Sequence, residues 1–323
     1  MVEILRANQQ NLKEAGKAIR RGELVVFPTE TVYGLGADAT SDKAVAAIYK
    51  AKGRPSHNPL IVHITSLEQA QKYGKFDDRA KKLAAKFWPG PMSLIVKRTE
   101  NCSLSEIVSA GGDTVALRMP AHPISRQLLE AANVPVAAPS ANLSGGISPT
   151  LPEHVKQGLG DKIFMLIDGG ACLVGVESSV ISVLPNESVK ILRPGSIDAN
   201  DVAQLLGEPI EQSQQSKSAH DILISPGLLS SHYAPKVSLR MNVNQPHKNE
   251  AYLAFGKHGF SNHSLNLSPS QNLHEAAQNL FAMLHALDAY CVENKFSIAV
   301  APIPNTSIGI AINDRLTRAA APK

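Results

Sequence analysis

The sequence predicts an α/β protein of two domains, and three observations support this prediction. The chain has 323 residues, which is ample for two domains at the usual size of roughly 100 to 200 residues each. Segments with helical apolar spacing alternate with short apolar runs, which is typical of strands separated by helices. A polar run without apolar periodicity at 211–218 indicates the start of a linker. We therefore predict a first domain at 1–210, a linker at 211–236 and a smaller second domain at 237–323.

The first domain is expected to open with a helix, a strand, a second helix and a second strand. Apolar residues recur at helical spacing up to Gly22, a favourable residue after a helix end, and the apolar run at 24–27 then predicts a strand. Asp42 can cap the next helix, which ends near Gly53, and the run at 60–64 predicts a buried strand. Beyond it the alternation continues, with strands predicted at 93–97, 114–118, 134–138, 164–168, 178–183 and 189–192, and helices at 77–87, 123–132 and 198–206.

The second domain is predicted to contain a βαβ unit. Apolar runs at 252–255 and 297–301 predict two parallel strands, and a long helix at about 273–292 lies between them in the chain. A parallel pair joined through a helix indicates a small Rossmann-like domain.

Three loops of the first domain carry small polar and charged residues next to predicted strands. One runs from Lys52 through Arg54 to His63, one has the sequence PTETVYGLG at 28–36, and one has the sequence APSANLSGGIS at 138–148. In open α/β sheets, ligands bind at strand ends. We therefore predict one shared site, with two cations and several hydroxyls suited to a polyphosphate.

Several common enzyme motifs are absent from the sequence. Gly34 and Gly36 imitate a dinucleotide-binding fingerprint, but no acidic residue follows about 20 positions later, where that motif requires one. We interpret these glycines as part of a tight turn. The sequence also lacks a Walker A motif, an HExxH motif and a GxSxG motif, so any ATP site must be unconventional.

Each candidate residue also has a structural interpretation. Two basic residues are usually solvated surface charges, although the constrained loop favours phosphate binding for the pair near Gly53. A histidine in an apolar strand is more often a hydrogen-bonded core residue. Ser140 and Asn142 can simply form a turn after a proline. Arg118 ends a strand, where it can be a rim charge or a fork for a carboxylate, and Ser178 either faces the site or begins a strand.

Composition limits the class of protein. The chain is 43% hydrophobic and 19% charged, as in a globular protein, and no apolar run approaches the roughly 18 to 20 residues of a membrane span. The first residues lack the apolar core of a secretory signal, so we expect a cytoplasmic protein with no membrane association. The three cysteines are widely spaced, which argues against a disulfide framework and a zinc site, and no protein metal site is predicted. The net charge of +4 is diffuse and does not identify a partner.

The polar loops together resemble those of the YrdC-like family. The resemblance rests on Lys52-x-Arg54, Ser140-x-Asn142 and the PTETVYGLG loop. The chain is more closely similar to the two-domain threonylcarbamoyl-AMP synthases, because SPG at 225–227 and HYAP at 232–235 occupy the place of their interdomain linker. The resemblance covers nearly the whole chain. One departure is LLSS at 228–231, where many members carry a methionine and a basic residue.

The resemblance implies a fold, an activity and a set of site residues. It implies a YrdC-like twisted α/β sheet domain followed by the Rossmann-like domain. It also implies a nucleotidyltransferase that makes threonylcarbamoyl-AMP and pyrophosphate from L-threonine, bicarbonate or CO2, and ATP with Mg²⁺ as its only cofactor, for the downstream machinery that modifies tRNA next to the anticodon. The residues implied around L-threonine are Thr31, His63, Arg118, Ala138 and Ser178. Those implied around ATP are Arg54, Asn58, Thr114, Ser140, Asn142, Ser148, Arg193 and Tyr233, with Lys52 and Arg54 as the catalytic cations.

Two other functions remain as alternatives. An RNA-binding or ribosome-associated YrdC-like module would use the same basic concavity for a nucleic-acid backbone, but stacking aromatics are expected there and only 5% of residues are aromatic. Direct tRNA binding is left open. The second alternative, a carbamoyl-transfer domain of a larger maturation enzyme, is disfavoured because no acylphosphatase-like or zinc-finger segment precedes Met1.

Overall fold

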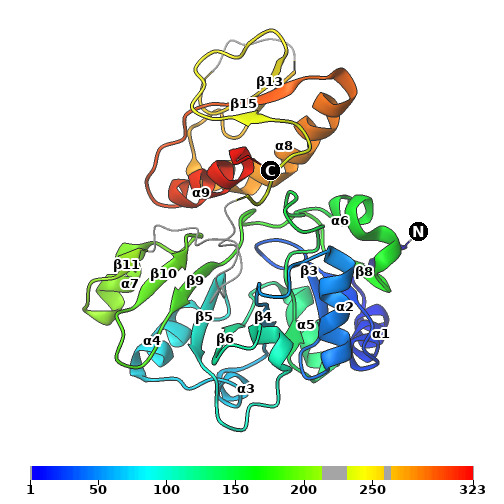
Figure 1. Ribbon diagram of the computed structural model, residues 1–323, viewed down its shortest axis with the longest axis vertical. Coiled ribbons are helices and arrows are strands. Elements are labelled where there is room, and N and C mark those ends of the chain that lie inside the picture. Colours follow the sequence, from blue (N-terminus) through cyan, green and yellow to red (C-terminus); the bar gives the residue numbers. More distant parts are fainter. Residues whose placement is uncertain (1, 213–230, 258–262, 323) are drawn as a thin grey trace.

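The computed structural model describes residues 2–212, 231–257 and 263–322, which form two α/β domains, one above the other in Figure 1. The larger domain contains one mixed sheet with the strand order β1-β8-β2-β3-β7-β4-β6-β5-β9-β10-β11. Its strands are β1 (Ile4–Arg6), β2 (Val25–Phe27), β3 (Gly34–Asp38), β4 (Ile61–His63), β5 (Met92–Lys97), β6 (Thr114–Arg118), β7 (Val136–Ala137), β8 (Met165–Asp168), β9 (Ser179–Ser182), β10 (Lys190–Arg193) and β11 (Glu211–Gln212). The predicted α/β class is confirmed.

Helices cover this sheet; the five predicted ones are present, and α3 and α6 were not predicted. They are α1 (Gln9–Arg20), α2 (Asp42–Lys52), α3 (Leu67–Gln71), α4 (Asp78–Phe87), α5 (Pro123–Ala132), α6 (Pro152–Leu159) and α7 (Ala199–Leu206), with short 3₁₀ turns η1 (Glu106–Ser109) and η2 (Gly160–Lys162). Helices α1 and α5 pack against each other at Gly16, where an added Cβ would lie 2.5 Å from the backbone carbon of Ala131. A side chain there would force the two helices apart.

The structure corrects three details of the sequence interpretation. Gly34 and Gly36 lie in strand β3 and not in a tight turn. Gly36 is needed for packing, because a Cβ there would approach the Phe27 ring to 2.7 Å. Ser41, and not Asp42, caps helix α2, since its side chain accepts a hydrogen bond from the backbone of Ala44. Finally, the segment predicted as linker begins with β11, which pairs in parallel with β10.

The smaller domain contains a parallel sheet of strand order β12-β15-β13-β14, and the predicted βαβ unit is confirmed. Its elements are β12 (Leu239–Arg240), β13 (Glu250–Ala254), β14 (Ser264–Asn266), α8 (Leu273–Asn294), β15 (Ser297–Val300) and α9 (Gly309–Ala320). Helix α8 is the long crossover between β14 and β15, and its buried residues include Leu280, Phe281 and Leu284. No described helix is both long and apolar enough to span a lipid bilayer.

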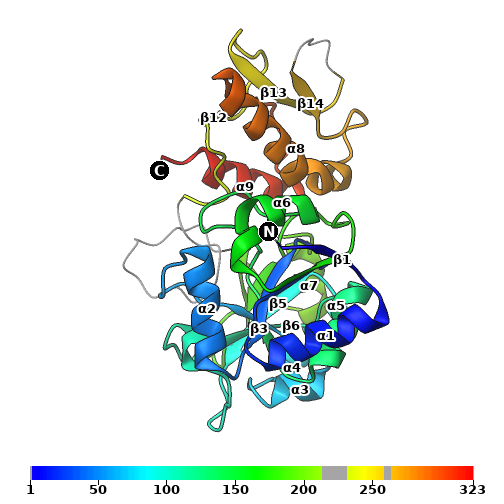
Figure 2. The ribbon, with the colours of Figure 1, turned by 90° about the vertical axis from the view of Figure 1, so that its right-hand side faces the viewer.

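The two domains share a tightly packed junction. In both views, α6 lies at the upper boundary of the larger domain and α9 at the lower boundary of the smaller one (Figure 1, Figure 2). The apolar core of the smaller domain extends across this boundary and includes Val32, Ile147 and Val176 of the larger one. At Gly175, which has a φ of +78°, a Cβ would lie 2.3 Å from the Ala277 carbonyl oxygen of α8. The approach is therefore too close for any other residue at this position.

Candidate functional site

A small buried cavity lies where several strands of the large sheet end and meet the segment that leads into the smaller domain. Its volume is about 40 Å³. This is far below the roughly 300 to 1,000 Å³ of a typical ligand pocket, so this conformation leaves no room for the substrates. The residues that line it are Thr31, Val32, Arg54, Ile61, His63, Arg118, Ala138, Pro139, Ser140, Glu177, Ser178, Arg193, His232 and Tyr233.

One part of the lining comes from the sheet, and we call it the sheet group: Thr31, His63, Arg118, Ala138 and Ser178. Neighbouring strands bring it together, since His63 of β4 pairs with Arg118 of β6 and the backbone of Ala138 donates to the carbonyl of Ile61 at 2.9 Å. All five residues predicted around threonine therefore meet at one cavity.

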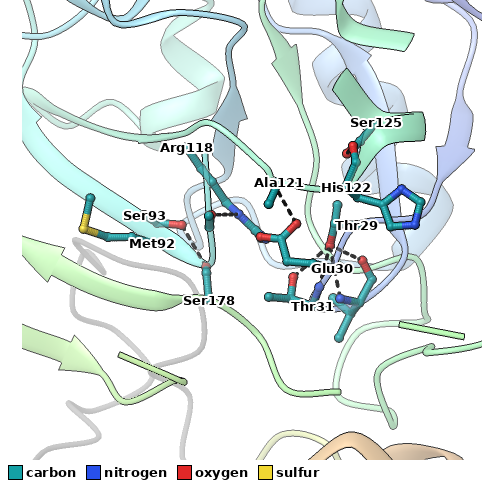
Figure 3. Close-up of polar contacts among 12 residues, drawn as sticks. Thr29, Glu30, Thr31, Met92, Ser93, Arg118, Ala121, His122, Ser125 and Ser178 are labelled. Carbon is teal, nitrogen blue, oxygen red and sulfur yellow. Dashed lines mark hydrogen bonds and ion pairs between the residues drawn. The ribbon is translucent and has the colours of Figure 1, made fainter. Parts of the chain in front are cut away.

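Arg118 is held by a buried ion pair (Figure 3). Its Nη2 lies 2.5 Å from Oε1 of Glu30, and Oε2 of Glu30 accepts a hydrogen bond from the backbone of Ala121 at 3.1 Å. Burial opposes the charge on Glu30, but the Arg118 guanidinium outweighs burial and holds the pKa of this carboxyl below its usual value. The guanidinium is therefore fixed in position before any ligand binds.

His63 is neutral in this environment. Burial, and then the nearby charge of Arg118, lower the pKa of its imidazole to about 3. Its Nδ1 is buried and has no hydrogen-bond partner among the described residues. Since a buried polar atom normally has a partner, this nitrogen is available to a ligand in the cavity.

The remaining polar lining is rich in cations, and we call it the basic group: Arg54, Ser140, Arg193, His232 and Tyr233, with Lys52 behind Ser140. Arg54 has an unusually constrained position, since its Nε donates to the Asn58 carbonyl at 3.0 Å and its Nη2 donates to Asn58 Oδ1 at 2.6 Å. Burial, followed by other causes that include repulsion from Arg193, lowers the pKa of Arg54 to about 10. These arginines are therefore close enough to hold one polyanion together.

Lys52 is buried behind the loop that contains Ser140. Its Nζ donates to the carbonyls of Ser140 and Asn142, at 2.5 and 2.6 Å. Burial, and then the charge of Arg54, hold the pKa of this amine well below its usual value. In this conformation Lys52 therefore fixes the backbone of the loop.

Four of the predicted ATP residues do not line the cavity. Asn142 donates through Nδ2 to the carbonyls of Leu143 and Gly146 and so shapes its own loop. Ser148 donates to Glu177. Thr114 is the first residue of β6 and Arg118 the last, so their side chains lie on the same face of the sheet but at opposite ends of the strand. Asn58 is buried behind Arg54, with its Nδ2 lacking a partner among the described residues.

Arg193 and Tyr233 complete the lining of the site. Arg193, at the end of β10, donates to the carbonyl of Ser178 at 2.9 Å and to its hydroxyl at 3.0 Å. Tyr233 is 1% exposed and has a φ of +62°, an uncommon conformation for a bulky residue. Its hydroxyl and Nδ1 of His232 are buried polar atoms without a partner among the described residues. Of the linker motifs, HYAP therefore reaches the site, whereas SPG lies outside the described residues.

Three site residues were not assigned from the sequence: Glu30, Glu177 and His232. Glu177 lines the cavity and is paired with Arg315 of α9, whose Nε lies 3.0 Å from its Oε2. Arg315 lies 138 positions further along the chain, so local sequence patterns could not connect the two. Glu30 belongs to the PTETVYGLG loop, but its ion pair with Arg118 forms only in the folded sheet, so the sequence did not reveal it.

Comparison with known proteins identifies the family. Residues 17–195 match the family described as "Telomere recombination", of the Sua5, YciO and YrdC proteins. Residues 197–321 match the family described as "Threonylcarbamoyl-AMP synthase, C-terminal domain".

Full-length relatives give the same result. The chain is 37% identical to the threonylcarbamoyl-AMP synthase of Bacillus subtilis, over 98% of this chain and 94% of that protein. It is 38% identical to the Pyrococcus abyssi synthase, over 97% and 95% of the two chains. The crystal structure of P. abyssi Sua5 complexed with L-threonine superimposes with a TM-score of 0.89 and 34% identity, covering 99% of this chain and 97% of that one.

Proposed function

The chain belongs to the threonylcarbamoyl-AMP synthase family, and we propose that it joins L-threonine, bicarbonate or CO2, and ATP into threonylcarbamoyl-AMP and pyrophosphate. The observation that carries this proposal is the cavity itself, in which Arg118 and the uncharged residues of the sheet group lie beside a second group of buried cations. The first suits a small amino acid, and the second suits a triphosphate.

The proposed reaction has two steps. The neutral amine of threonine adds to CO2 and loses a proton, which gives a carbamate. A carbamate oxygen then attacks the α-phosphorus of ATP, the bond to the β-phosphate oxygen breaks, and pyrophosphate leaves. Neither step needs a covalent enzyme intermediate, so fixed positive charge and orientation supply the catalysis. Burial favours the neutral, reactive amine, because desolvation disfavours an ammonium ion.

We propose that L-threonine binds to the sheet group. Arg118, already oriented by Glu30, would hold the carboxylate. His63 Nδ1 and the hydroxyl of Thr31 lie at the same cavity and would contact the polar groups of threonine. The P. abyssi relative was solved as a complex with L-threonine, which supports this amino acid as the ligand.

ATP would bind to the basic group. Arg54 and Arg193 would contact phosphate oxygens, and Tyr233 and Ser140 would contact the nucleotide from either side. Four residues behind the lining would support it without direct contact in this conformation: Thr114, Asn58, Asn142 and Ser148. Lys52 would hold the Ser140 loop and add positive charge when the nucleotide is bound.

Mg²⁺ is proposed to enter with ATP. The carboxylate that lines this cavity, Glu177, is paired with Arg315, and Glu30, next to the lining, is paired with Arg118. Phosphate oxygens and water would therefore supply its ligands, as they commonly do for this ion.

The closed cavity requires that the site opens for substrates. At about 40 Å³ it is too small for ATP and threonine together. Tyr233, in the segment that joins the domains, covers it and is the natural part to move. We propose that this segment closes over ATP and keeps water from the labile adenylate. A cytoplasmic location and delivery of the product to the tRNA-modifying machinery are part of the same proposal.

Pyrophosphate release tests the proposal directly. Release should require ATP, L-threonine and bicarbonate together, because the nucleophile is the adduct of the last two. Release that continues without threonine would contradict it. An RNA-binding module would instead bind RNA and release no pyrophosphate under any of these conditions.

A further inference from the structure

The smaller domain reaches into the cavity wall through one side chain, Arg315 of α9. This side chain is completely buried. Its Nε lies 3.0 Å from Oε2 of Glu177, and its Nη1 donates to the carbonyl of Pro194 at 2.7 Å. These two partners belong to the larger domain, and Glu177 lines the cavity, while Nη1 also lies 2.9 Å from Oδ2 of Asp314 in α9. A residue of the second domain is thus in direct contact with the wall of the proposed nucleotide site.

Arg315 also supports Tyr233. Its guanidinium carbon lies 5.5 Å from the centre of the Tyr233 ring, which stacks on Phe281 of α8 at 5.6 Å between ring centres. Tyr233 therefore rests on the smaller domain while its hydroxyl is buried at the cavity. Since its backbone has a positive φ, this support from both sides helps to maintain an uncommon conformation.

Glu177 has a second link to the smaller domain. Its Oε1 accepts a hydrogen bond from the hydroxyl of Ser148, and the carbonyl of Ser148 lies 3.2 Å from Nε2 of His285 in α8. Two helices of the smaller domain therefore converge on one short network, Ser148 and Glu177, next to the basic group.

Charge explains why this network matters for a nucleotide. Glu177 is a carboxylate on the wall where we place a triphosphate, and an unneutralised anion there would repel it. We propose that Arg315 is a positioning residue of the active site: it neutralises Glu177 and supports Tyr233, so that the smaller domain completes the ATP site. This inference rests on the proposed function and assigns a role to the smaller domain within it.

The central variant is Arg315→Met, which keeps much of the volume and removes the charge. In the full-length protein, we expect the ATP KM and the Kd for a non-hydrolysable ATP analogue to rise at least about tenfold. The Kd for L-threonine should change less than about twofold, since the sheet group does not contact Arg315. Arg240→Met is the matched control, because it breaks another ion pair of the same domain, with Glu250 at 2.7 Å, away from the cavity.

A double variant separates charge from simple destabilisation. Glu177→Gln in the Arg315→Met background removes the carboxylate that has lost its cation, and it should recover most of the ATP affinity. If both variants bind ATP equally weakly, neutralisation of Glu177 is not the role of Arg315 and the proposal fails. Unchanged ATP affinity in Arg315→Met would overturn it as well.

The pH dependence gives an independent measurement. Burial opposes the charge on Glu177, but Arg315 and then Arg193 outweigh it and hold the pKa of Glu177 below its usual value. Without Arg315 that pKa should rise, so lowering the pH should improve ATP affinity in Arg315→Met more than in wild type. Identical pH profiles would contradict the proposal. The charged and titratable groups that act electrostatically on Glu177 or feel its charge are Arg315, Arg193, Lys52 and Tyr233.

If Arg315→Met does not fold, Arg315→Lys decides the question. The ammonium keeps the positive charge beside Glu177, and charge governs the repulsion of the triphosphate, so the ATP KM should rise no more than about threefold. A tenfold rise would overturn charge neutralisation. Failure of the wild-type protein to bind ATP or release pyrophosphate would contradict the proposed function, whereas an active wild type with an unaffected Arg315→Met would contradict this inference alone.

Discussion

The sheet group and the basic group meet at one cavity but are built in different ways. The sheet group lies on adjacent strand ends, and its key arginine is already paired with Glu30 inside the same domain. The basic group is held by loops, by the segment containing Tyr233 and by Arg315 from the second domain. The comparison indicates that the proposed threonine site is preformed, whereas the proposed ATP site requires the whole chain.

The largest effect should follow from Arg118→Met. It removes the proposed carboxylate ligand and leaves Glu30 buried without its cation. We expect turnover to be lost and the free energy of unfolding to fall by about 3 to 5 kcal/mol. Urea unfolding and pyrophosphate release measure both quantities. Stability equal to wild type would show that the sheet group is not preformed by this ion pair.

Arg54→Ala should affect activity more than stability. We expect a fall in turnover of at least tenfold, in line with the roughly 2 to 4 kcal/mol that a positioned charge contributes to a transition state. Lys50→Ala, at an exposed position of helix α2, which ends just before Arg54, is the matched control. Wild-type turnover in Arg54→Ala would remove that residue from the ATP site.

Tyr233→Ala tests whether the basic group depends on the segment between the domains. We expect weaker ATP binding, or more hydrolysis of the adenylate, while L-threonine binding is retained. Truncation after Leu206 should be worse. If the truncated protein binds ATP and forms product as well as the full-length protein, this segment only tethers the two domains.

The sequence predicted most elements of the first domain and most residues of the two groups. Helical spacing and apolar runs located most elements of the first domain. The residues proposed to bind threonine lie at one cavity because strand ends share an edge of the sheet. Local patterns could not show that Gly36 packs against Phe27, since that requirement comes from a neighbouring strand. Nor could they connect Glu177 with Arg315, which meet only when the domains pack together.

Substrate choice tests the sheet group alone. Serine lacks the methyl group of threonine and should be a poorer substrate by about 1 to 3 kcal/mol in kcat/KM, the usual contribution of one methyl in a fitted pocket. The ATP KM should be the same with either amino acid, because the basic group does not contact the methyl. Equal kcat/KM for serine and threonine would show that the cavity does not fit the side chain.

The smallest effect concerns the junction that supports the basic group. His154 of α6 stacks on His285 of α8 with 3.9 Å between ring centres, and burial, then the charge of His285, lower the pKa of His154 to about 3. Unfolding therefore takes up a proton between that value and the usual 6.5, so this stabilisation is complete above pH 6.5 and is lost as the pH falls toward 3. The melting temperature should fall between pH 7.5 and 5 less steeply in His154→Gln than in wild type. His274→Gln, at an exposed position of α8, should retain the wild-type slope. An unchanged slope in His154→Gln would show that the stacked pair does not set the acid sensitivity of the junction.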